Sequence, residues 1–323
     1  MLRIDEFTPS EENYERLVEV VNGAWPDEPT SLAGLKHREA SRPPGRYYRR
    51  IVGWAGERMV AAGSAMESVW SYRPGKYQVD IDLHGAFESD ENRAQMYDLL
   101  VEALYRREPA PVLLTANARE DRADQVRFLT DRGFVPVMRY PRSRLLVNEF
   151  DFAPYAGLIE GVESSGIGIY SLAELMVSDP QWQRKMYELD WAGTQDEPAP
   201  EPITQLPFEL YAQRVFAGPE FLPEGNFIAV DGDKYVGLSS LERDLARPGH
   251  METGFTCTRR SHRRRKIAMA LKLKAIDFAK ESGVETIETG NEEKNPMYQI
   301  NLRLGFQPLP AWSDYHKTID RKR

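Results

Sequence analysis

The stretch "TRRSHRRRKIAMALK", from Thr258 to Lys272, joins a basic cluster to the start of an apolar periodic segment. Six of its first nine residues are Arg or Lys, although the 323-residue chain carries a formal net charge of -8. The preceding "METGFTCT", from Met251, alternates in polarity and predicts a strand. A strand that turns directly into a helix leaves N–H groups unpaired at the positive end of the helix dipole. The sequence therefore predicts an anion site at this turn.

The segment after the cluster predicts a helix that begins near Arg265 or Lys266, because apolar residues recur there every three or four positions. The stripe consists of Ile267, Leu271, Ala275 and Phe278, with Lys272, Lys274 and Lys280 expected elsewhere on the surface. Basic side chains are normally unfavourable in the first turn of a helix. The four basic residues from Arg263 to Lys266 therefore indicate that this turn binds an anion, such as a pyrophosphate.

The chain contains a long internal repeat. "IVGWAGERMVAAGSAMES", from Ile51, and "FIAVDGDKYVGLSSLERD", from Phe227, both predict a hairpin with a glycine in its turn. "VLLTANAREDRADQVRFLTDRGFVP", from Val112, resembles "IETGNEEKNPMYQINLRLGFQP", from Ile287. The first half also carries a helical stripe, formed by Met96, Leu99, Leu100 and Leu104. These patterns predict an α/β fold class of the α+β mixed-sheet type, in two tandem domains that are each a central mixed sheet flanked by helices.

Irregular segments indicate the limits of the domains, and composition indicates the compartment. The expected domains are residues 1–150 and 167–323, joined by a linker at 151–166, while the Pro-rich "DEPAPEP" from Asp196 is expected to be a loop inside the second domain. Cys257 is the single cysteine, so no intramolecular disulfide is possible, which fits a reducing compartment. The chain shows neither a signal-peptide pattern nor an apolar run of membrane-spanning length, and we expect a cytoplasmic protein.

The strand, the basic turn and the following helix, together with "NPMYQINLRLGF" from Asn295, resemble the GNAT acetyltransferase superfamily. The architecture is similar to that of its tandem two-domain members, of which mycothiol synthase is an example. The resemblance covers most of Ile167 to Tyr315 and, in weaker form, Leu2 to Val147. The family motif Gln/Arg-x-x-Gly-x-Gly/Ala falls on Ser261 to Lys266, where Arg264 and Lys266 replace both glycines.

The resemblance implies acetyl-CoA as co-substrate and assigns residues to it. The thioester carbonyl would be held near the strand residues Thr256, Cys257 and Thr258, and the pyrophosphate at Arg263, Arg264, Arg265, Lys266, Ile267 and Ala268. Asn291 and Asn295 would bind the pantetheine arm, although strand-end and helix N-cap roles are an alternative for both.

The resemblance also implies N-acetyl transfer to a primary amine, by direct attack with a carboxylate or a water-relayed base. Glu252 is the first candidate for the base and Glu242 the second; the alternative for both is a solvated carboxylate at a strand edge. The position where many relatives carry a tyrosine general acid holds Asn301, which leaves Tyr298, water or no group for that role. His250 and His262 are expected in a turn and a loop, and Cys257 is expected to pack as a small hydrophobe.

The first half differs from the second at the anion turn. Overlaying the two halves places Ser89, Asp90, Glu91 and Asn92 where Arg263, Arg264, Arg265 and Lys266 stand. Acidic side chains repel phosphate, so we expect a degenerate first domain without cofactor. Aromatic and acidic residues are also expected on the acceptor side of the second domain, where they would suit a cationic amine. The alternative is that the aromatic residues belong to the core and the acidic ones to a solvated surface. The residues are Trp182, Tyr187, Trp191, Phe221, Glu188, Asp190, Asp196 and Glu197.

Two other functions stay open at this point. A catalytically silent acyl-CoA binding protein is consistent with the lost glycines and with Asn301. The second open function is nucleic-acid binding through the basic run 259–266. Two observations argue against it: the chain as a whole is acidic, and no aromatic residues are interleaved with the run. The expected acceptor is a small-molecule or peptide amine, and no metal motif is present. Oligomeric state is open, since the two fused copies could form an internal pseudo-dimer.

Overall fold

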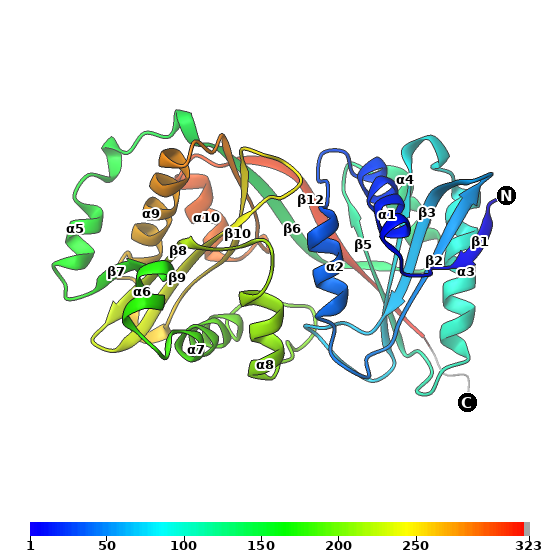
Figure 1. Ribbon diagram of the computed structural model, residues 1–323, viewed down its shortest axis with the longest axis horizontal. Coiled ribbons are helices and arrows are strands. Elements are labelled where there is room, and N and C mark those ends of the chain that lie inside the picture. Colours follow the sequence, from blue (N-terminus) through cyan, green and yellow to red (C-terminus); the bar gives the residue numbers. More distant parts are fainter. Residues whose placement is uncertain (320–323) are drawn as a thin grey trace. The chain divides into compact units, whose positions relative to one another are not determined.

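The computed structural model describes residues 1–319, which form two compact units (Figure 1). Unit 1 contains Met1–Arg139, Pro200–Thr204 and the segment from Pro310 onward. Unit 2 contains Tyr140–Ala199 and Gln205–Leu309. The boundaries expected from the sequence, 1–150, 151–166 and 167–323, follow chain order, whereas the units exchange segments. The expected domain boundaries therefore stay a prediction.

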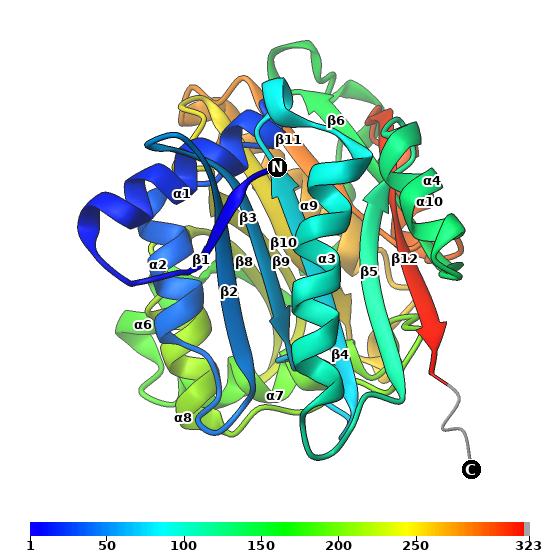
Figure 2. The same ribbon diagram turned by 90° about the vertical axis from the view of Figure 1, so that its right-hand side faces the viewer.

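Unit 1 is a mixed sheet with helices on it. Its strand order is β1 (Arg3–Glu6), β2 (Tyr48–Ala55), β3 (Arg58–Met66), β4 (Lys76–Leu83), β5 (Leu113–Arg119) and β12 (Gln307–Thr318). Strands β4 and β5 pair in parallel, and the other neighbouring strands of this unit pair antiparallel. Its helices are α1 (Glu11–Ala24), α2 (Leu32–Ala40), the short turn η1 (Gly85–Phe87), α3 (Asp90–Tyr105) and α4 (Ala123–Asp131). Figure 2 shows α3 lying across one face of this sheet.

Unit 2 repeats the plan. Its strand order is β6 (Val135–Leu146), β11 (Thr286–Gly290), β10 (His250–Thr258), β9 (Lys234–Arg243), β8 (Phe221–Asp231) and β7 (Gly168–Ser171). Strands β10 and β11 pair in parallel, and the other neighbouring strands of this unit pair antiparallel. Its helices are α5 (Leu158–Glu163), α6 (Leu172–Ser178), α7 (Trp182–Thr194), α8 (Phe208–Tyr211), α9 (Ile267–Glu281) and α10 (Pro296–Arg303). Shorter turns are η2 (Val147–Glu149), η3 (Ala153–Tyr155), η4 (Ala212–Phe216) and η5 (Arg260–His262). The predicted fold class is confirmed for both units.

The two hairpins predicted from the repeat are present as β2–β3 and β8–β9. Their turn glycines, Gly56 and Gly232, have φ of +62° and +61°, a left-handed conformation that favours glycine. The sequence pattern therefore located both turns correctly.

The closing strands are exchanged between the two repeats. Strand β12, at the end of the chain, pairs with β5 of unit 1 from Trp312 opposite Arg119 to Thr318 opposite Leu113. Strand β6, which ends the first repeat, pairs with β11 of unit 2, with Leu146 opposite Thr286. Strand patterning specifies that a segment joins a sheet but not which sheet it joins, so the sequence could not reveal this exchange.

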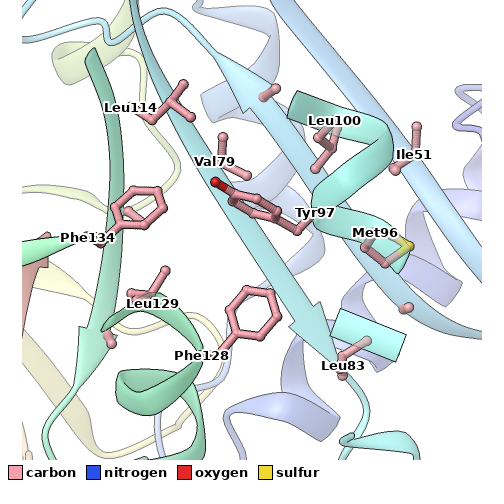
Figure 3. Packing of buried hydrophobic residues seen from close by; sticks show 14 of the residues in the cluster. Ile51, Val79, Leu83, Met96, Tyr97, Leu100, Leu114, Phe128, Leu129 and Phe134 are labelled. Atoms are coloured by element: carbon pink, nitrogen blue, oxygen red, sulfur yellow. The ribbon is translucent and has the colours of Figure 1, made fainter. Parts of the chain in front are cut away.

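The core of unit 1 lies between its sheet and helices α3 and α4 (Figure 3). Three residues of the predicted stripe, Met96, Leu100 and Leu104, are 0% exposed. Leu99 was expected in the same stripe but is 38% exposed, because it lies one position outside the buried face of α3.

Helix α9 anchors the core of unit 2. It begins at Ile267, one or two residues after the predicted start, and the expected surface position of Lys272 is wrong: Lys272 is only 4% exposed. The buried residues Ala270, Leu271, Leu273, Ala275 and Ile276 show that the helix is covered over a wide arc. A helix covered on more than one side buries positions beyond a single stripe. Among residues 1–319, no helix is both long enough and apolar enough to cross a bilayer.

Candidate functional site

Strands β10 and β11 separate near the middle of unit 2. They pair over three residues only, from His250 opposite Thr286 to Glu252 opposite Glu288. Beyond this point a small cavity of about 40 Å³ lies between Thr253–Thr256 on one strand and Thr289–Asn291 at the end of the other. Its remaining lining residues are Glu197, Lys272, Asn295 and Met297. Two parallel strands that part in this way open the sheet to a ligand at its centre.

A bulge in β10 lies beside this opening. Thr253 pairs with Leu241 and Thr256 with Ser239, so Gly254 and Phe255 together face Ser240. The Ser240 hydroxyl oxygen accepts a hydrogen bond from the Phe255 N–H at 2.7 Å. A Cβ atom at Gly254 would meet the Glu242 Oε1 at 2.3 Å. Glycine at this position therefore lets the Glu242 carboxylate lie directly against the strand backbone.

The turn after β10 has an unusual backbone. Arg264 and Lys266 have φ of +63° and +61°, and they are the only non-glycine residues with positive φ among residues 1–319. These are the two positions where the resemblance expects glycine. The left-handed conformation costs a long side chain about 1 kcal/mol or more, and such strain is concentrated at functional sites. The turn thus keeps a glycine-type backbone although its residues carry positive side chains.

The N-terminus of α9 is open to an anion. Its N-cap, Lys266, has no side-chain hydrogen bond to the helix, and the first turn contains no acidic residue. In unit 1, by contrast, the hydroxyl of Ser89 caps α3 by accepting from the Asn92 N–H, and Asp90 and Glu91 occupy its first turn. The two helix starts correspond in position, but only the one in unit 2 leaves its N–H groups available.

The basic cluster divides into two groups of side chains. Arg260 and Arg263 both donate to the carboxylate of Asp196, and the Arg260 hydrogen bond is the main reason that the pKa of Asp196 is lowered. Arg265 donates to the Ser165 carbonyl at 3.3 Å. Arg264 and Lys266 are exposed and have no hydrogen-bond or ion-pair partner among the residues that the structure describes. The first group fixes the turn, and the second can meet a ligand.

Glycine at the two strained positions is expected to stabilise the protein. Arg264→Gly and Lys266→Gly should each raise the free energy of unfolding by up to about 1 kcal/mol, because glycine adopts the left-handed conformation without strain. Arg265→Gly is the matched control, since Arg265 lies between them without a positive φ and should lose stability. Urea titration would measure the free energy of unfolding of all three variants. A lower value for the glycine variants at positions 264 and 266 would contradict the inferred backbone strain.

Glu242 and Glu252 stand opposite each other on β9 and β10. Burial, together with the nearby Glu220 and Glu252, raises the pKa of Glu242 to about 7, although the residue as a whole is exposed. Glu252 accepts a hydrogen bond from Arg142 at 2.6 Å and lies 3.5 Å from Arg247. The same two guanidinium groups bind Glu288. Burial raises the pKa of Glu252, and Arg142 opposes this rise.

The asparagines surround the far side of the cavity. Asn295 caps α10 by accepting from the Met297 N–H at 3.0 Å, so the N-cap alternative holds, and it also lines the cavity with Asn291. Asn301 is 0% exposed and donates to the Asn291 Oδ1 at 2.6 Å, while its own Oδ1 has no partner. Tyr298 is half-buried on α10 outside the set of residues that line the cavity.

Lys272 is the site residue that sequence reasoning missed. It lines the cavity and is 4% exposed, and no hydrogen-bond or ion-pair partner for it exists among the described residues. Burial lowers the pKa of its ammonium group to about 8. The available signal was local: Met269 and Ile276 stand three positions before and four positions after it, so it continues an apolar face of the helix.

The remaining strand residues have mixed roles. Thr256 lines the cavity, and its hydroxyl is 3.2 Å from that of Ser239. Cys257 is 7% exposed in the core, and burial raises the pKa of its thiol to about 12, as fits a small hydrophobe. Thr258 is buried, with its carbonyl accepting from Arg263 at 3.2 Å. Ile267 is 2% exposed in the core, and Ala268 follows it in the first turn of α9.

Several residues expected on the acceptor side are engaged in packing. Trp182 packs against Phe216 with ring centroids 4.9 Å apart and the rings tilted by 58°, and the Tyr187 hydroxyl donates to the Leu206 carbonyl at 2.6 Å. Burial raises the pKa of Asp190 to about 6, and Glu197 alone of the expected acidic set lines the cavity. His262, expected in a loop, ends the short turn η5, and its Nε2 lies 2.9 Å from the Asp231 carboxylate. His250, expected in a turn, is instead the first residue of β10 and contacts the Thr286 hydroxyl.

Comparison with known proteins agrees with this geometry. Residues 183–306 match the model of the acetyltransferase (GNAT) family. A tandem GNAT protein from the clavulanic acid biosynthesis pathway superposes with a TM-score of 0.75 at 16% identity, covering 100% of both chains. A GCN5-related N-acetyltransferase from Sphaerobacter thermophilus gives 0.68 at 16% identity, covering 98% of this chain and 96% of its own.

A more distant structure widens the comparison. Saccharomyces cerevisiae N-myristoyltransferase with bound myristoyl-CoA and inhibitors gives a TM-score of 0.62 at 11% identity, covering 98% of this chain and 80% of its own. A search of curated proteins found no match to the chain. Residues 183–306 thus match the GNAT family of acetyltransferases, and the whole chain has the fold of a tandem GNAT protein.

Proposed function

We propose that unit 2 is an acyl-CoA-dependent N-acyltransferase that moves an acetyl group from acetyl-CoA to a primary amine of a small molecule or peptide. The observation that carries this proposal is that β10 forms one side of the opening between the parted strands and then leads through a short turn into the uncapped, basic N-terminus of α9. The opening would take a thioester, and the helix N-terminus would take a pyrophosphate.

The turn from Arg263 to Lys266 would bind the pyrophosphate. The left-handed Arg264 and Lys266 shape the backbone, and their unpaired side chains supply two positive charges. The other basic residues hold the turn in place through Asp196. The thioester would lie at the bulge around Thr256, with Asn291 and Asn295 beside the pantetheine arm.

Glu242 is the base that we favour, although Glu252 was the first candidate from the sequence. A carboxylate with a pKa of about 7 is poised to accept a proton from an attacking amine near neutral pH. Its contact with Gly254 places it at the bulge where the acyl carbonyl is expected. Glu252 is less available because it is bonded to Arg142.

Lys272 would assist the departure of CoA. When the amine attacks, the C–S bond breaks and the sulfur leaves as a thiolate that needs a proton or a positive charge. The cavity-lining ammonium of Lys272 can supply both, in place of the tyrosine that Asn301 replaces. Tyr298 remains the alternative on α10.

Lys272→Met is expected to lower kcat about a hundredfold without destabilising the protein. Methionine fills a similar volume and removes a buried charge that has no hydrogen-bond or ion-pair partner among the described residues and lies 5.9 Å from the centre of the Phe306 ring, so stability should stay equal or rise. The rate of the unchanged protein should fall as pH rises through about 8, where Lys272 loses its proton. Steady-state kinetics would test whether the variant loses this decrease of the rate at alkaline pH. A variant with unchanged kcat and an unchanged pH profile would exclude a role of Lys272 in the departure of CoA.

The function itself is tested by calorimetric titration with acetyl-CoA and with longer acyl-CoA thioesters, followed by a thiol-release assay with a panel of amines. One site per chain with amine-dependent release of CoA supports the proposal. Binding without turnover would favour a silent acyl-CoA binding protein, which the buried Asn301 at the position of the family's general acid makes the second candidate. Absence of binding at low salt would overturn both.

A further inference from the structure

Unit 1 contains its own cavity at the place where its parallel strands part. Strands β4 and β5 pair only from Lys76 opposite Leu113 to Gln78 opposite Thr115. The cavity begins beyond this point and has a volume of about 320 Å³, in the range of small-molecule sites. Residues Val79–Asp82 of β4 and Ala116 and Asn117 of β5 line it on the two strands. Nothing in the acyl-CoA chemistry of unit 2 uses this space.

A CoA molecule does not fit the chemistry of this cavity. The corresponding helix start is closed by the Ser89 cap, and Asp90 and Glu91 would repel a pyrophosphate. Strand β4 also pairs regularly with β3 through Asp80 and Asp82, without the bulge seen in unit 2. The cavity must therefore be judged by its own lining.

Two carboxylates face the cavity from the same side of β4. Asp80 accepts hydrogen bonds from the Gln78 amide at 3.0 Å, and Asp82 accepts one from the Trp25 indole at 2.8 Å. Both partners are neutral, although burial raises the pKa of both groups and that of Asp80 to about 6. A buried carboxylate is stable only when its charge is compensated.

The nearby arginines are already engaged. Arg50 pairs with Glu39, Arg93 pairs with Glu88 and also donates to the Ile81 carbonyl, and Arg38 donates to the Thr30 hydroxyl. Arg42, Arg50 and Arg93 act on the two aspartates only as more distant positive charges. The aspartates thus keep oxygen atoms available for a cationic partner from outside the protein.

The walls of the cavity are aromatic. Trp25 and Trp312 line it together with ring centroids 4.6 Å apart, and Tyr97 packs edge-on against Phe128. Tyr97 is 5% exposed, and its hydroxyl group has no hydrogen-bond partner. Figure 3 shows this hydroxyl directed toward Val79, another lining residue. The Tyr97 hydroxyl is itself buried, so the groups that the cavity offers to an organic cation are the two carboxylates and the aromatic rings.

We propose that the cavity of unit 1 binds a small organic ammonium compound, with Asp80 and Asp82 as partners of its amino group and the aromatic walls around its apolar body. The ligand class follows from the lining of unit 1 alone. The proposal therefore does not rest on the acyltransferase function of unit 2.

The test uses phenethylamine, which is cationic, beside neutral 2-phenylethanol and anionic phenylacetate of similar shape. Calorimetry and tryptophan emission should both report saturable binding of phenethylamine with a Kd below about 1 mM and at least tenfold weaker binding of the other two. The variant Asp80→Asn with Asp82→Asn should lose this binding tenfold or more. Asp98→Asn with Asp131→Asn, two exposed acidic positions of the same unit, should leave it unchanged.

A further variant separates this proposal from that for unit 2. Arg264→Glu with Lys266→Glu should keep phenethylamine binding even though it removes acyl-CoA binding. The proposal would be overturned if phenethylamine did not bind or if the three probes bound with equal affinity. It would also be overturned if phenethylamine still bound to the aspartate variant while the thermal transition of that variant was unchanged. Acetyl-CoA binding that is lost in the aspartate variant would also overturn it, because the cavity would then be a cofactor site.

Discussion

Replacing Arg264 and Lys266 together by glutamate is expected to weaken acetyl-CoA binding at least a hundredfold while unit 2 stays folded. Both side chains are exposed and unpaired, so the reversal removes no internal contact among the described residues. It places two negative charges at the uncapped start of α9, where the pyrophosphate is proposed to bind. A hundredfold loss corresponds to about 2.8 kcal/mol, a modest sum for two charge reversals beside a phosphate.

The control for this variant is Lys280→Glu with Arg303→Glu. These exposed residues lie in the last turns of α9 and α10, and the change in net charge is the same. Calorimetry should show acetyl-CoA affinity within a few-fold of the original for the control alone. If both variants bound acetyl-CoA with equal affinity, the position of the reversed charges would not matter, and the turn would not be the pyrophosphate site.

Glu242→Gln is expected to lower kcat about a hundredfold or more at neutral pH while acetyl-CoA binds as before. Glutamine keeps the shape of the side chain and its contact with Gly254 but cannot accept a proton from the amine. Because the pKa of Glu242 is raised to about 7, the carboxylate form increases as pH rises through that value. The rate of the unchanged protein should therefore rise across pH 7, and the variant should lose this rise.

Two further variants decide whether Glu242 is the base. Glu252→Gln should keep the rising limb if Glu242 accepts the proton, and should lose it if the first candidate from the sequence is correct. Glu220→Gln removes a neighbouring negative charge that raises the pKa of Glu242, so the limb should move to lower pH. Pre-steady-state rates across pH would measure both shifts, and an unmoved limb in Glu220→Gln would contradict the assignment.

The sequence by itself determined the architecture because its information is local. Periods of two and of three to four residues, with glycines at Gly56 and Gly232, specify strands, helices and turns without reference to distant parts of the chain. The repeat of these patterns predicted two mixed sheets. The anion turn was also local, since a strand, a basic run and a helix are adjacent in the chain.

The identity of the acting side chains was decided by tertiary structure alone. Burial of Lys272 depends on what covers α9, and the contrast between Glu242 and Glu252 depends on Arg142, which arrives from β6 more than a hundred positions earlier in the chain. The exchange of β6 and β12 depends on pairing between distant strands. Local patterns state which backbone conformation a segment prefers, but charge, burial and pKa are set by neighbours that only the folded chain brings together.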